Sequence, residues 1–168
     1  MLINWQAILD EHGRAVWNTT YRMLGNDADA SDCFQQTFAD ALMFSQKQNV
    51  KNFRALLLKL ATRRSLDALR QRCRKANPVS FELIQEHNIK AADCPIANTE
   101  NKELSEILLN AFSLLDSEEA QIFCLRHIEN LSMTEIAQAF GLKENYVGVI
   151  VHRAKNKLKI LLEKYYRG

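Results

Sequence analysis

The sequence is poor in the residues that interrupt helices, because only two prolines and five glycines occur among its 168 residues. Proline breaks a helix interior and glycine weakens it, so their scarcity favours helix over most of the chain. No apolar stretch approaches the roughly 20 residues that span a bilayer, and the N-terminus has no basic segment followed by an apolar run. We therefore expect an all-α protein without membrane insertion and without a signal peptide.

The patterns that hold metals or carry enzymatic chemistry are also missing. The four cysteines form no Cys-x-x-Cys pair and have no histidine at zinc-ligand spacing. There is no glycine-rich phosphate loop, and none of the four histidines joins a serine or a cysteine in a nucleophilic arrangement. We expect no metal, no cofactor and no catalytic residue. Cys33 and Cys124 are expected to pack, reduced, in the core of a cytoplasmic protein.

The charged residues fall into three blocks, although the net charge is only +2. Residues 51–75 contain nine basic side chains and one acidic, residues 76–120 contain two basic and nine acidic, and residues 141–168 contain seven basic and two acidic. One basic block alone is usually a solvated helix face. Two basic blocks separated by an acidic one indicate two segments that bind a polyanion.

A helix-turn-helix pattern lies at the start of the second basic block. Ser132 and Glu135 have the spacing of a capping box, which begins a helix. Gly141 stands where the turn needs a residue that tolerates a positive φ, and Val147 and Ile150 supply the apolar face of a second helix. The pattern indicates a protein that works on nucleic acid.

The remaining periodicity divides the chain into two parts. Apolar residues at helical spacing predict helices over 5–23, 27–42 and 53–75, with a polar loop over 45–52. Two prolines bound a polar, weakly periodic stretch, and strong helical spacing returns near residue 103. We predict two small helical domains joined by a linker. The boundaries are a helical domain over 1–76, an acidic linker over 77–102 and a helix-turn-helix domain over 103–168.

Three motifs in this order resemble a known family. Residues 27–38 read Asp-Ala-Asp-Ala-Ser-Asp-Cys-Phe-Gln-Gln-Thr-Phe, residues 53–70 begin Phe-Arg-Ala-Leu-Leu and end Leu-Asp-Ala-Leu-Arg, and residues 125–155 contain the helix-turn-helix followed by His-Arg-Ala-Lys. Together they resemble the small, two-domain extracytoplasmic-function (ECF) sigma factors of the sigma-70 family, which direct bacterial RNA polymerase to promoters. The resemblance covers nearly the whole chain and implies a sigma factor with no enzymatic activity of its own.

The resemblance implies three sets of functional residues. The first set would bind the clamp helices of the polymerase β′ subunit: Asp29, Asp32, Gln35, Gln36 and Phe38. The second would recognise and melt the −10 promoter element: Lys47, Asn49, Lys51, Asn52, Arg54, Arg63 and Arg64. The third would read the −35 element: Lys143, Asn145, Tyr146, His152, Arg153 and Lys155. The implied partners are core RNA polymerase, including its β flap, promoter DNA and an anti-sigma factor.

The sequence departs from the family pattern at a few positions. Leu56 replaces a usual tryptophan, and Arg63 replaces a usual asparagine. In the second helix of the helix-turn-helix, Gly148, Val149 and Ile150 replace basic and hydroxyl residues, which weakens base reading from that part of the helix. Two alternatives therefore remain. One is a helix-turn-helix regulator that acts without polymerase, and the other is a sigma-like interaction module with weakened promoter reading.

Overall fold

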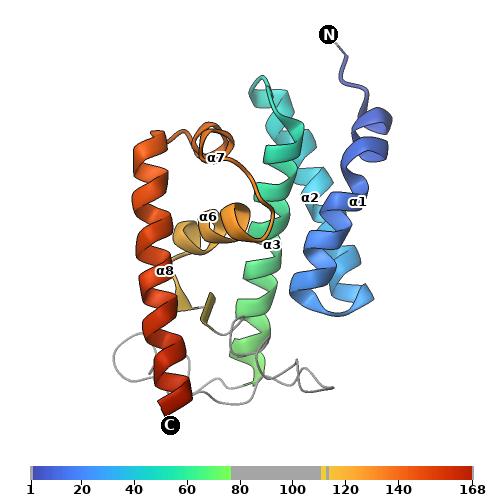
Figure 1. Cartoon of the computed structure of the whole chain (residues 1–168). Helices are drawn as coiled ribbons and strands as arrows, with labels where there is room; N and C mark the ends of the chain where they lie inside the picture. Colours follow the sequence, from blue (N-terminus) through green and yellow to red (C-terminus); the bar gives the residue numbers. More distant parts are fainter. Residues whose placement is uncertain (1, 77–110, 113, 168) are drawn as a thin grey trace.

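The computed structural model describes residues 2–76, 111–112 and 114–167, and within these ranges the chain contains helices and no strand. The helices are α1 (Trp5–Leu24), α2 (Asp27–Lys47), α3 (Phe53–Ala76), α6 (Ser117–His127), α7 (Met133–Phe140) and α8 (Glu144–Arg167) (Figure 1). The predicted all-α class is confirmed. No helix in the described part of the chain is long and apolar enough to cross a membrane. The predicted linker lies outside the described residues, and the bounds of the two domains and the linker stay a prediction.

Local capping explains where the first helices begin and end. The Asn4 side chain accepts a hydrogen bond from the Ala7 N–H, which starts α1, and Gly25 ends it with a φ of 72°. Asn26 then caps α2 by accepting from the Asp29 N–H at 2.9 Å. Because α2 continues to Lys47, the polar loop is shorter than predicted and spans residues 48–52. Exposed polar residues fit a helix end as well as a loop, so the polar pattern alone placed the boundary too early.

The helices α1, α2 and α3 form one unit around a small apolar core. Val16, Ala41, Leu57 and Ala61 pack together, and all four are fully buried. These residues come from all three helices at helical spacing, so each helix buries one apolar stripe.

The helices α6, α7 and α8 form the helix-turn-helix unit. Ser132 and Glu135 make both bonds of the predicted capping box at the start of α7, and Gly141 ends α7 with a φ of 65°. Leu125, Ile136 and Val147, one from each helix, are fully buried in its core. The predicted capping box, glycine turn and second-helix apolar face are therefore confirmed.

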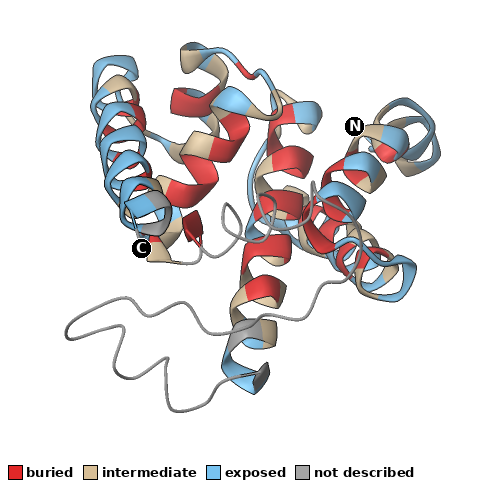
Figure 2. Cartoon of the chain, turned by 60° about the horizontal axis from the view of Figure 1, so that its bottom comes forward, coloured by how far each residue is buried: buried red, intermediate tan, exposed pale blue. Residues whose placement is uncertain are grey.

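The two units pack against each other along α3. Leu57 and Leu58 are sequence neighbours that are both buried, but Leu57 lies in the core of the first unit whereas Leu58 packs with residues of α6 and α7. Figure 2 shows buried positions around α3 on the sides of both neighbours. A further cluster joins Met23, Cys33 and Leu66 to Cys124 and Leu158. The two helical units thus share buried apolar contacts.

Polar contacts accompany this packing. Arg22 forms an ion pair with Glu129 at 3.3 Å, and Arg70 donates a hydrogen bond to the Leu115 carbonyl at 2.9 Å. Cys33 and Cys124 are buried, as predicted, and burial raises the pKa of the Cys124 thiol to about 12. Both cysteines therefore serve as apolar core residues rather than as reactive thiolates.

Candidate nucleic-acid interface

The residues predicted for the −10 element lie in two groups along the first unit. Lys47, Asn49 and Lys51 are exposed where α2 ends and the loop passes to α3, and Asn52 and Arg54 follow at the start of α3. Arg63 is exposed further along α3, at roughly 13 Å from Arg54 because a helix rises 1.5 Å per residue.

Arg64 is turned toward the protein. Its guanidinium donates two hydrogen bonds to the Asp40 carboxylate, at 2.7 and 2.8 Å, and thereby joins α3 to α2. Such a bidentate pair holds the guanidinium in one orientation. The structure therefore gives Arg64 a role within the fold, in contrast to the exposed Arg63.

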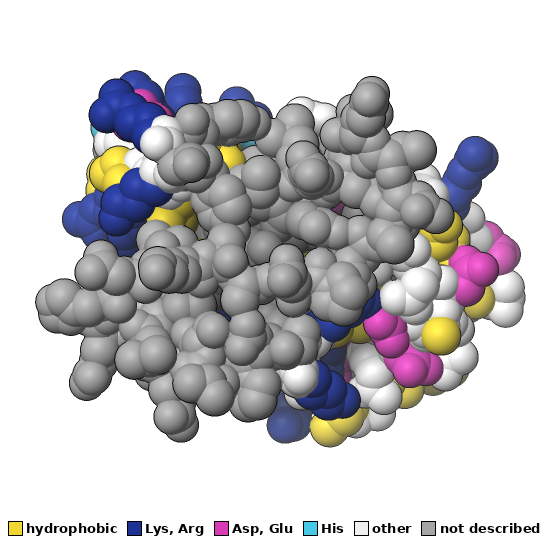
Figure 3. Space-filling model, turned by 90° about the horizontal axis from the view of Figure 1, so that it is seen from below, with side chains coloured by type: hydrophobic (Ala, Val, Ile, Leu, Met, Phe, Trp, Pro, Cys, Tyr) yellow, Lys and Arg dark blue, Asp and Glu magenta, His cyan; other side chains and the backbone are white. Residues whose placement is uncertain are grey.

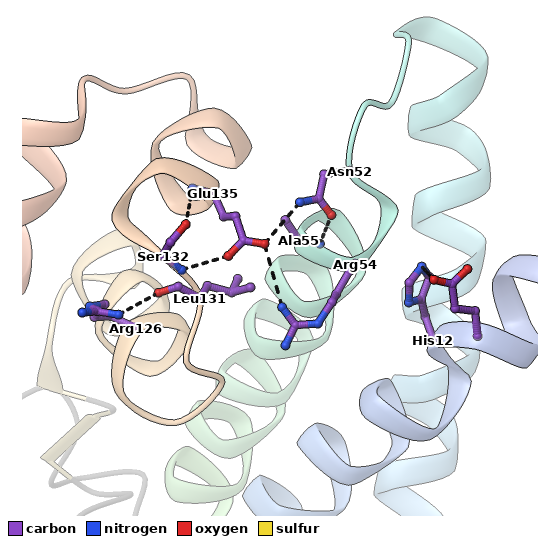
Figure 4. A network of polar contacts seen from close by, with 9 residues as sticks. His12, Asn52, Arg54, Ala55, Arg126, Leu131, Ser132 and Glu135 are labelled. Carbon is purple, nitrogen blue, oxygen red and sulfur yellow. Dashed lines mark hydrogen bonds and ion pairs between the residues drawn. The ribbon is translucent and has the colours of Figure 1, made fainter.

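Two of the candidate −10 residues contact the helix-turn-helix unit (Figure 4). The Glu135 carboxylate accepts a hydrogen bond from the Ser132 N–H at 2.9 Å, accepts another from the Asn52 side chain at 3.5 Å, and lies 3.9 Å from the Arg54 guanidinium. Asn52 also caps α3, because its side chain accepts from the Ala55 N–H. The bond from Ser132 is the main cause that holds the pKa of Glu135 below its ordinary value.

Lys59, which was not among the predicted site residues, makes another polar contact between the two units. Its Nζ donates to the Ala139 carbonyl at 2.7 Å and lies 4.2 Å from the centre of the Phe140 ring. A cation is favourable at the end of a helix because the last carbonyls are unsatisfied. Burial is the main reason why the pKa of Lys59 is lowered, and the positive charge of the nearby Arg63 lowers it further.

A cleft of about 350 Å³ lies between the α2–α3 loop and α7. Its lining includes Phe44, Asn49 and Asn52 on one side and Glu135 and Gln138 on the other. Phe44 exposes 37% of its surface and lies beside polar neighbours in this cleft. An aromatic ring next to amide groups and lysines is the chemistry that accommodates an unstacked nucleic-acid base.

The residues predicted for the −35 element all lie exposed on α8 or directly before it. Successive helix residues are rotated by about 100°, so Asn145, Val149 and His152 share the side opposite the buried Val147 and Ala154. The remaining predicted residues are Lys143, which precedes the helix, Tyr146 and Lys155 on the two flanks, and Arg153. Val149 lies at the centre of this face and was not among the predicted site residues.

One face of the molecule shows where exposed charged side chains gather. Seen from below, lysine and arginine side chains gather on the side where α8 lies, whereas the side of α1 and α2 shows acidic and basic side chains together (Figure 3). The second basic block of the sequence is therefore presented to solvent as one region along α8. A basic helix face of this kind attracts the phosphate backbone of DNA.

The predicted polymerase-binding residues on α2 are only partly available. Asp32, Gln35 and Gln36 are exposed, whereas Asp29 accepts hydrogen bonds from Asn26 and from Arg72 at 2.6 Å. Both hydrogen bonds lower the pKa of Asp29 below its ordinary value, and the bond from Asn26 has the larger effect. The structure therefore assigns Asp29 to the junction of α2 and α3.

Phe38 is half-buried beside an apolar groove that the sequence analysis did not identify. The groove runs between α1 and α2 and is lined by Trp5, Leu9, Phe34, Phe38 and Leu42. It lies next to the exposed Gln35, which also contributes to its lining. Among the described residues, no three His, Cys, Asp or Glu side chains gather where they could hold a metal ion.

Comparison with known proteins assigns the chain to a family. Residues 8–75 match Sigma-70 region 2, and residues 105–158 match Sigma-70, region 4. The chain is 27% identical over 165 residues to the ECF RNA polymerase sigma factor SigE of Mycolicibacterium smegmatis, and 24% identical over 159 residues to SigW of Bacillus subtilis. The chain belongs to the sigma-70 family and is of the ECF type.

The extent of these matches differs between the relatives. The alignment with SigE covers 96% of this sigma factor but only 63% of SigE, whereas the alignment with SigW covers 90% and 85%. The fold is similar to that of the sigma factor RpoE from Bartonella quintana, which was crystallised with the anti-sigma factor NepR. That similarity has a TM-score of 0.57 and 18% identity, over 95% of this chain and 96% of RpoE.

Proposed function

We propose that this sigma factor binds core RNA polymerase in the cytoplasm, directs it to promoters and opens the −10 element. The observation that carries the proposal is the presence of two separate basic surfaces, one on each family region of the same chain. The first surface comprises the exposed Lys47, Lys51 and Arg63 at the end of α2, in the loop and on α3, and the second is the outer face of α8. A protein with both surfaces can contact promoter DNA at two places, while the polymerase performs the chemistry.

The region around the loop would hold the melted −10 strand. Lys51 and Arg63 supply exposed positive charge for the backbone, and Phe44 offers a ring on which an unstacked base can stack. Asn49 lies in the same cleft and has both a donor and an acceptor for a base edge. These residues provide the three kinds of contact that single-strand capture needs.

The α2 side of the first unit would bind the clamp helices of the β′ subunit. Asp32, Gln35 and Gln36 offer exposed polar groups, and the neighbouring groove offers apolar surface, which together suit the side of an amphipathic helix. The helix-turn-helix unit would approach the β flap. We also propose an anti-sigma factor as a partner, because a structural relative was crystallised with one.

Run-off transcription with core polymerase tests the proposal. The chain should support initiation from a promoter library, and Lys51→Ala and Arg63→Ala should reduce it on duplex templates. A template with a pre-melted −10 region should restore most of this loss, because the variants impair opening rather than assembly. Arg14→Ala is the matched control, since Arg14 is exposed on α1, outside the candidate surfaces.

The outcomes separate the proposal from the two alternatives. A chain that binds duplex DNA as a dimer without polymerase would be a helix-turn-helix regulator. A chain that binds core polymerase but supports initiation at no promoter would be an interaction module. Either result would overturn the proposal.

A further inference from the structure

Gly148 lies within α8, away from both of its ends, and the packing of the fold gives no reason for a glycine at this position. A glycine inside a helix costs about 1 kcal/mol relative to alanine. Gly141 adopts a positive φ, and a Cβ on Gly13 would approach Leu9 to 3.3 Å, so both of those glycines have a structural cause. Gly148 has neither, because a Cβ built there meets no described atom within 4 Å apart from its sequence neighbours and the backbone of its own helix. The described residues thus give no packing reason for this glycine and leave the helix surface at Gly148 open to a partner.

The surroundings of Gly148 indicate what that partner offers. Gly148 and Val149 lie in a shallow surface groove whose lining also includes Met133 from α7 and Asn145 and Arg153 from α8. Val149 is 45% exposed at the centre of the outward face of α8. The groove thus combines the apolar Met133 and Val149 with the polar or charged side chains of Asn145 and Arg153, and Glu144 and His152 complete its lining. An apolar side chain at the centre of a DNA-facing helix gains free energy only when it meets an apolar group.

Within the major groove of DNA, the apolar group is the C5-methyl of thymine. We propose that Val149 reads a thymine methyl in the −35 element, and that Gly148 lets α8 approach the base edges closely enough for this contact. Asn145, one turn before Val149, is placed for a neighbouring adenine, and Arg153 for a phosphate. This inference rests on the proposed function, and it names the base type that this −35 reader selects.

Replacing thymine by deoxyuridine tests the contact, because this removes the methyl group and nothing else. A promoter is first selected by run-off transcription, with core polymerase and the full chain, from a library with a randomised −35 element. Each −35 thymine is then replaced in turn. At one position we expect holoenzyme binding to weaken about fourfold, the effect of one buried methyl group. With Val149→Ala, the same replacement should have no effect.

Ile160→Ala is the matched control, since Ile160 is an exposed apolar residue of α8 that does not line the groove. This control variant should keep the full sensitivity to deoxyuridine. If the holoenzyme transcribes but no −35 thymine shows the effect, or if Val149→Ala keeps it, the inference is overturned while the proposed function stands. If the chain and core polymerase transcribe no promoter in the library, the proposed function fails, and the inference with it.

Discussion

The two candidate DNA-binding surfaces differ in what covers them. On α8, the outward face is open, and its central residues Asn145, Val149 and His152 are exposed. On α3, the helix-turn-helix unit lies against the surface. Lys59 bonds to the end of α7, and Asn52 bonds to Glu135 at its start. In this conformation the outward face of α8 is exposed, whereas the helix-turn-helix unit covers part of α3.

The contact between the helix-turn-helix unit and α3 is stabilised mainly by apolar packing. Leu58 is 1% exposed and packs with Ile122 and Leu125, whereas Arg54 and Glu135 form a long, solvent-exposed ion pair. Exposed ion pairs contribute between 0 and about 1 kcal/mol, and a buried leucine contributes more. The comparison therefore predicts that apolar substitutions on α3 affect the contact between the units more than charge substitutions do.

The largest effect is expected from Leu58→Ala, with Leu57→Ala as its matched partner on the same helix. Each substitution removes a buried leucine and should lower the free energy of unfolding by about 2–5 kcal/mol. Leu57→Ala should do so within the first unit, which contains both tryptophans, so tryptophan fluorescence reports its loss directly. Leu58→Ala should instead increase amide hydrogen exchange in α6 and α7. Unchanged exchange in α6 and α7 would contradict the assigned role of Leu58.

A smaller but more specific effect is expected from a charge placed inside the contact. Ala139→Arg puts a cation beside Lys59, whose Nζ lies 2.7 Å from the Ala139 carbonyl. Two cations on neighbouring side chains repel, so the contact between the units should weaken and the radius of gyration should rise in X-ray scattering. The free chain should then bind a single-stranded −10 oligonucleotide several-fold more tightly.

Thr134→Arg supplies the control for this experiment. It adds the same charge to α7 at an exposed position whose side chain bonds to Glu144, away from α3. If both variants bind the oligonucleotide equally well, the gain comes from net charge, and α7 does not obstruct the −10 surface. With core polymerase present, the advantage of Ala139→Arg over Thr134→Arg should shrink if assembly already separates the units.

Substitutions of two glycines, Gly141 before α8 and Gly148 within it, test the role of α8 in this comparison. Gly141→Ala forces an alanine into a left-handed conformation and should lower the free energy of unfolding by about 1–2 kcal/mol. Gly148→Ala adds a methyl group to an open helix surface and should raise it by up to about 1 kcal/mol. Urea denaturation measures both values. Only Gly148→Ala should then weaken −35 binding by the folded protein, and a loss of stability there would show that Gly148 has a structural role after all.

The sequence predicted local structure well because local structure depends on neighbouring residues. Ser132, Glu135 and Gly141 form their cap and turn from interactions within a few residues, so their spacing was sufficient evidence. Cys33 and Cys124 were predicted in the core from the apolar faces on which they lie. The end of α2 was placed too early, because exposed polar residues fit the last turn of a helix as well as a loop.

The contact between the two units was not predicted, although one signal for it is present. Residues 55–58 are four consecutive buried positions, and a helix that is apolar around most of its circumference is covered on more than one side. Nothing local identifies what covers it. The role of Lys59 is likewise invisible, because it depends on the end of a helix that lies 80 residues further along the chain. Val149 at the centre of the α8 face shows the same limit, since the family pattern directed attention to polar residues.

The smallest effect is expected from Glu135→Gln, and it depends on pH. The fold holds the pKa of Glu135 below its ordinary value of 4.5, mainly through the Ser132 N–H. The stabilisation is therefore complete above about pH 4.5 and is lost as the pH falls through the lower pKa of the folded state. At pH 6 the variant should lose up to about 1 kcal/mol, because a neutral amide interacts less favourably with the N-terminus of α7. As the pH falls below 4.5 and through the lowered pKa of the folded state, the variant and the parent should converge in urea midpoint. Asp29→Asn serves as a control. The fold also lowers the pKa of the Asp29 carboxylate, but Asp29 lies in the first unit, away from α7.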